Sequence, residues 1–89
     1  MPYIDQNRRD ALQDPVIVPE TVGELNYLMT KLVDAYIVRK GVSYTHINNA
    51  IGALECAKLE LYRRLAAPYE DEKSRVNGEV YNAIRSIGA

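Results

Sequence analysis

Glu55 and Lys58 are the residues whose types and spacing best suit chemistry, because they lie three positions apart in an apolar stretch. At about 100° per residue on an α-helix, both fall beside Ile51, Leu54 and Tyr62 rather than on the polar side. Residues with this spacing are neighbours and can form an ion pair. If this side of the helix packs against another helix, both charges are partly desolvated. A desolvated carboxylate next to an amine is a candidate catalytic pair. The same pair at a helix–helix seam sets register instead, and we favour this structural interpretation because no third catalytic group accompanies it.

The carboxylates suggest a second chemistry, the binding of a hard cation such as Mg²⁺. Glu24 and Glu55 are the candidate metal ligands, with Asp34 and Glu60 as further acids. In the all-α nucleoside-triphosphate pyrophosphohydrolases, a Glu-x-x-Glu pair on one helix and a Glu-x-x-Asp pair on the next bind Mg²⁺ together. Here the acids are spaced as Glu20–Glu24 and Glu55–Glu60, which does not match. The sequence therefore predicts no metal and no cofactor.

His46 and Cys56 are the single histidine and the single cysteine of the chain. Neither has a partner at the spacing of a zinc site. We expect His46 to be a surface or capping residue, and Cys56 to be a buried or half-buried inert thiol. One cysteine also excludes an intramolecular disulfide, which fits a reducing compartment.

Charge and hydropathy exclude other classes of partner. The formal net charge is −1, from 11 basic and 12 acidic residues, so the chain has no large field to attract nucleic acid or an anionic membrane. No apolar run approaches the roughly 20 residues that span a bilayer, and the first residues lack an apolar signal core. We expect a cytoplasmic protein with no nucleic-acid or membrane partner.

Two long helices must position the candidate residues. Thr21 and Glu24 match the capping box that starts a helix, and Gly41 suits its end. Ser43 is the expected N-cap of the next helix, whose apolar stripe lasts about 24 residues. The stripe of the first helix contains Val22, Leu25, Leu28, Met29, Leu32, Val33 and Tyr36, and that of the second contains Ile47, Ala50, Ile51, Leu54, Ala57, Leu61 and Leu65. Because so few residues join them, the two helices are predicted to form an antiparallel hairpin.

Shorter segments flank this hairpin. A short helix is expected over residues 5–13, capped by Asp5 and ended before Pro15, and Val16–Val18 is expected to be an extended connector. Pro68 is expected to break the chain and restart a helix that ends at Asn77-Gly78. We expect a weak last turn or a docking segment after it.

These segments predict one helical domain over residues 1–89. It divides into a short helix with a connector (1–20), the hairpin (21–67) and a short helix with a tail (68–89). The expected fold class is thus all-α.

The chain resembles a family of small uncharacterised proteins of bacterial, archaeal and phage genomes over about residues 1–81. The strings that carry the resemblance are Gly23-Glu24-Leu25-Asn26-Tyr27, Leu54-Glu55-Cys56, Lys58-Leu59-Glu60, Tyr62-Arg63-Arg64, Ala67-Pro68-Tyr69-Glu70-Asp71-Glu72-Lys73, Asn77-Gly78 and Tyr81. The resemblance implies a prokaryotic or phage cytoplasmic setting and no established activity.

Two long apolar stripes are more than short flanking segments can cover, and small domains often need extra support. We therefore expect a homodimer that completes a helical bundle, with a further protein partner possible. The function expected from the residues is a non-enzymatic interaction or assembly protein. The alternative is a small metal- or nucleotide-dependent enzyme, or a ligand-binding protein, with an acidic site between helices built from Glu24, Glu55 and Lys58.

Overall fold

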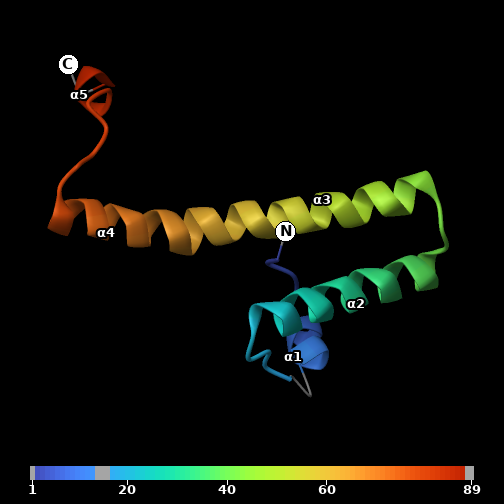
Figure 1. Ribbon diagram of the computed structural model, residues 1–89. Helices are drawn as coiled ribbons and strands as arrows, with labels where there is room; N and C mark the ends of the chain where they lie inside the picture. The colour runs from blue at the N-terminus through green and yellow to red at the C-terminus, as the bar shows by residue number, and fades with distance from the viewer. Residues whose placement is uncertain (1, 14–16, 88–89) are drawn as a thin grey trace. The chain divides into compact units, whose positions relative to one another are not determined.

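The computed structural model describes residues 2–13 and 17–87, and within these ranges every regular element is helical, with no β-strand (Figure 1). The predicted all-α class is confirmed. Val16 lies outside the described ranges, whereas Ile17 and Val18 are non-helical and exposed. The elements are α1 (Gln6–Gln13), α2 (Val22–Lys40), α3 (Tyr44–Leu61), the π-helical η1 (Tyr62–Ala66), α4 (Ala67–Asn77) and α5 (Ile84–Ile87).

Asp5 starts α1 as predicted. Its carboxylate accepts a hydrogen bond from the Asn7 amide at 2.8 Å, and its carbonyl accepts one from the Arg9 amide at 3.0 Å. These bonds satisfy amides that a helix start leaves without intrahelical partners. The expected stop before Pro15 lies outside the described residues.

Thr21 and Glu24 start α2, with one difference from the predicted capping box. The Thr21 hydroxyl accepts a hydrogen bond from the Glu24 amide at 3.1 Å, as expected. The Glu24 carboxylate accepts one from the amide of Glu20 at 3.0 Å, one residue before the amide that the standard motif uses. Gly41 follows the helix with a φ of 96°, and its amide donates to the Ile37 carbonyl at 2.8 Å.

Ser43 is the N-cap of α3, as predicted. Its hydroxyl accepts a hydrogen bond from the His46 amide at 3.1 Å, and its carbonyl accepts one from the Ile47 amide at 3.0 Å. The cap holds the start of α3 directly after the short connection from α2.

The predicted break at Pro68 is wrong. Pro68 does lie in the first turn of α4, but α3, η1 and α4 follow one another without a loop. Proline has no N–H, and its ring clashes with the carbonyl four residues earlier. The turn before it widens instead, so that the Ala67 amide donates to the Tyr62 carbonyl five residues back. The helix then ends at Asn77 as predicted, before Gly78 with a φ of 98°.

Contacts within the chain group it into two compact units, Met1–Ala57 and Lys58–Ala89. The first contains α1, α2 and most of α3, and the second contains the end of α3, η1, α4 and α5. The single domain over 1–89 and its predicted subdivision stay predictions.

Burial is sparse throughout the described residues. Ala50 of α3 is their one buried side chain, with 7% of its surface exposed. No helix in the described ranges combines the length and the hydrophobicity needed to cross a membrane.

Candidate interaction surface on helices α2 and α3

Glu55 and Lys58 both lie on α3, and both side chains are exposed. A carboxylate or an amine becomes a catalytic group mainly when burial or a neighbouring charge shifts its pKa. The chain does not supply that burial at either residue. Their assignment as a catalytic or a register-setting pair stays a prediction.

Glu24 lies in the first turn of α2, where its carboxylate accepts a hydrogen bond from the Glu20 amide. In the part of the chain that the structure describes, no three His, Cys, Asp or Glu side chains come close enough to hold a metal ion. Within those residues, Glu24 and Glu55 therefore do not belong to a cluster of three possible metal ligands.

His46 braces the connection between α2 and α3. Its Nδ1 lies 2.9 Å from the Gly41 carbonyl oxygen, and the side chain is half-buried. The expectation was a surface or capping residue, and the ring contacts the connection that precedes α3.

Cys56 is exposed, so the expectation of a buried or half-buried thiol is wrong. The buried side of α3 is centred on Ala50. Six residues later, the helix has turned Cys56 about 120° away from that side.

A shallow groove of about 350 Å³ lies in the first unit, with α2 and α3 both contributing to it. We call it the Ala50 groove, after the buried residue in its floor. All of its lining residues are uncharged. They are Leu32, Val33 and Tyr36 from α2, and Asn49, Ala50, Ala53 and Leu54 from α3.

A second hollow of about 300 Å³ adjoins this groove, because Val33 and Leu54 line both. Its other lining residues are Asn26, Met29 and Thr30, all on α2. The two hollows make one uncharged surface that runs along α2 and includes α3.

Large apolar side chains border this surface and lie open to solvent. Leu32 is 72% exposed, Met29 42% and Leu54 44%. Single exposed leucines are ordinary, but a contiguous apolar patch on a soluble protein marks an interaction site. The arrangement thus suits binding to another apolar surface better than chemistry on a substrate.

The sequence patterns found part of this surface. Leu32, Val33 and Tyr36 belong to the predicted stripe of the first long helix. Asn49 and Ala53 belong to neither predicted stripe. The available signal was the pair of alanines at 50 and 53, whose small side chains at helical spacing leave a depression beside larger neighbours.

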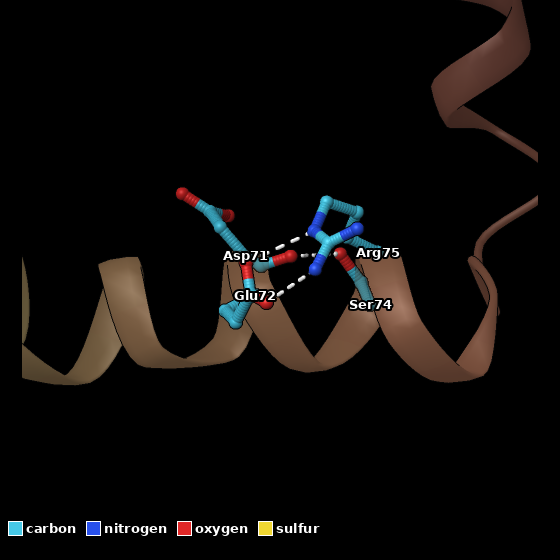
Figure 2. Close-up of polar contacts among 4 residues, drawn as sticks. All are labelled: Asp71, Glu72, Ser74 and Arg75. Atoms are coloured by element: carbon cyan, nitrogen blue, oxygen red, sulfur yellow. Dashed lines mark hydrogen bonds and ion pairs between the residues drawn. The ribbon is translucent and has the colours of Figure 1, made fainter.

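The second unit carries a different surface, in the stretch for which a docking role was considered. A hollow of about 400 Å³ there is lined by α4 and the residues after it, with both acidic and basic side chains. Along α4, Arg75 donates hydrogen bonds from Nε and Nη2 to the two carboxylate oxygens of Glu72, at 3.0 and 2.6 Å (Figure 2). The Ser74 hydroxyl donates to the Asp71 carbonyl at 2.9 Å. Such contacts are typical of a solvated helix.

A family model described as a domain of unknown function, DUF6899, matches residues 1–80. Searches of curated proteins and of solved structures found no match to the chain. The match names no activity, so function has to be inferred from the surface itself.

Proposed function

The chain belongs to the DUF6899 family of domains of unknown function, and from this premise we propose that it is a non-enzymatic interaction protein. It binds its partner through the apolar surface to which α2 and α3 both contribute, namely the Ala50 groove and the adjoining hollow that Met29 lines. The partner presents an apolar helical side of its own, since the groove offers no charge to pair with.

One observation carries this proposal: the chain leaves most of its large apolar side chains in water. Among the described residues, Ala50 is the one buried side chain. On α2 and α3, Leu32 and Ile51 expose 72% and 59% of their surface. Burying apolar surface is the main favourable term in association, so such a surface gains from a partner.

We propose that α2 and α3 run antiparallel along the groove that both of them line. Two features support this arrangement. The connection contains only Gly41, Val42 and Ser43, and residues of both helices line the same groove. Short connections favour antiparallel neighbours.

We place this function in the cytoplasm. Cys56 is an exposed free thiol, and such a thiol persists best where the compartment keeps it reduced. A prokaryotic or phage setting stays the prediction that the resemblance makes.

A dye-binding experiment tests the proposal. Full-length protein is examined by light scattering and with a dye that fluoresces on apolar surfaces. If the surface serves interaction, the chain either associates through it or binds the dye as a monomer, and Leu32→Gln reduces whichever is seen. Leu12→Gln is the matched control, because Leu12 is 62% exposed on α1 and lies outside the groove.

The contrary result is a monomer that binds no dye. Such a chain would cover its apolar surface internally, and the proposal would fall. Equal effects of Leu32→Gln and Leu12→Gln would also contradict it, since the response would not come from the groove.

A further inference from the structure

We infer that the partner is a second copy of this chain, and that the two copies meet about a twofold axis, with Leu32 of each copy seated in the Ala50 groove of the other. This inference rests on the proposed function and names the partner of the same surface.

The shape of the surface is self-complementary. Leu32 protrudes from α2 with 72% of its surface exposed, whereas Ala50, in the floor of the same groove, is 7% exposed. A twofold contact needs one patch that carries both a protrusion and a depression that receives it. Leucines inserted between small residues of a facing helix are the ordinary unit of helix packing.

The charges allow two copies to approach. The groove lining is uncharged, and the formal net charge of −1 leaves almost no repulsion between identical chains. On the exposed part of α2, Lys31 and Asp34 form an ion pair at 3.9 Å, so neither sign predominates there.

The apolar side chains of this surface are open to a second copy. Leu32, Met29 and Leu54 line the two hollows and expose 72%, 42% and 44% of their surface. Burial of these side chains against another apolar surface favours association. Two copies that join their α2 and α3 helices form a four-helix bundle, which buries apolar stripes on all four helices.

Charge complementation tests this geometry on the full chain. Ala53→Arg puts a cation on the exposed α3 side of the groove. Leu32→Glu puts an anion at the position of the side chain that is proposed to enter the partner's groove. Each variant alone should dimerise at least roughly tenfold more weakly than the parent, because an unpaired charge is buried twice. Mixed in equal amounts, the two variants should form a heterodimer, because it contains one Arg–Glu contact and one parental contact.

Sedimentation or light scattering of differently tagged chains reads out the result. The parent should show twice the chain mass of 10.1 kDa, and Leu12→Gln should match the parent. Circular dichroism checks that each variant keeps its helices. If the mixture forms no heterodimers, Leu32 does not contact the Ala50 groove of the partner copy, and the inference is wrong.

The inference and the proposed function fail in different ways. A parent that stays monomeric, yet binds the apolar dye in a Leu32-dependent manner, would overturn the second copy as partner and leave an interaction surface for another protein. A monomer that binds no dye would overturn both.

Discussion

Single side chains near the helix ends decide where the helices begin. The Thr21 hydroxyl accepts from the Glu24 amide, the Ser43 hydroxyl accepts from the His46 amide, and each bond joins residues three positions apart. Because these bonds are local, they form wherever the chain becomes helical, and they do not depend on the rest of the fold.

Thr21→Ala should lower the free energy of unfolding by about 1 kcal/mol, because the Glu24 amide loses its acceptor. Urea unfolding followed by circular dichroism, at one fixed protein concentration, measures the change. Glu24→Gln is the control, since its side-chain oxygen can still accept from the Glu20 amide. A Thr21→Ala protein as stable as the parent would show that this cap does not hold the start of α2.

Glu72 should titrate below an ordinary glutamate. The two hydrogen bonds from Arg75 lower the pKa of the Glu72 carboxyl from its ordinary value of 4.5 (Figure 2). A group whose folded pKa is depressed contributes stability above its unfolded pKa, and this contribution is lost as the pH falls through the folded pKa. The pair should therefore support α4 at neutral pH and cease to do so in acid.

A carboxyl-carbon NMR titration of Glu72 checks this expectation. Arg75→Gln removes the guanidinium and should move the Glu72 midpoint upward towards the ordinary value. An unchanged midpoint in Arg75→Gln would mean that the hydrogen bonds are not formed in solution.

At the scale of the elements, the helices owe their ends to two glycines with positive φ and their continuity to one adaptable turn. Gly41 and Gly78 end α2 and α4 with φ values of 96° and 98°. Pro68 does not end a helix, because the turn over 62–66 widens to place the Ala67 amide on the Tyr62 carbonyl. Backbone geometry, more than side-chain packing, sets these boundaries.

Replacing Gly52 and Gly41 by alanine should have opposite effects. Gly52 lies inside α3, and a Cβ there meets nothing within 4 Å, so Gly52→Ala should raise the free energy of unfolding by about 0.5–1 kcal/mol. Gly41→Ala should lower it by about 1 kcal/mol, because alanine is strained at a φ of 96°. Thermal unfolding of the parent and of both variants measures these two changes in the free energy of unfolding. A destabilising Gly52→Ala would instead reveal that another helix packs closely against this position.

At the scale of the whole molecule, the main feature is how little the chain hides by itself. Ala50 is buried, while large apolar side chains such as Leu32 and Ile51 remain 72% and 59% exposed. Small domains with so small a core commonly obtain further burial by association. The two proposals above, an interaction surface and a second copy on it, follow from this imbalance.

The melting temperature should therefore rise with protein concentration, because association of folded chains stabilises them by mass action. Scanning calorimetry of the parent over a wide concentration range measures this dependence. Ala53→Arg should lower the melting temperature and remove the dependence, whereas Leu12→Gln should keep it. A parent whose melting temperature is independent of concentration would contradict association.

The helical class and most helix ends were predictable from the sequence. Asp5, Thr21, Ser43, Gly41 and Gly78 each act where the sequence analysis placed them. The exception is Pro68, whose lack of an N–H predicts the lost hydrogen bond but not whether the chain responds with a loop or with a wider turn.

Within the candidate surface, the sequence identified the apolar stripes, Ala50 among them, but not the two residues beside Ala50. Asn49 and Ala53 line the groove beside Ala50, although asparagine is polar and alanine is small enough to suit any side of a helix. Nor did composition indicate that Glu55 and Lys58 would be exposed. Helical periodicity gives the relative angles of the residues on one helix, and it leaves open which of those angles another element covers.

The sequence by itself determined that this protein is helical and where most of its helices begin and end, because caps, glycines and apolar spacing act over three or four residues. The tertiary structure alone decided that Ala50 is covered, that Cys56 is exposed and that Leu32 stands beside an uncharged groove. Burial depends on segments far apart in the chain that reach the same place, and no local pattern of residues contains that information.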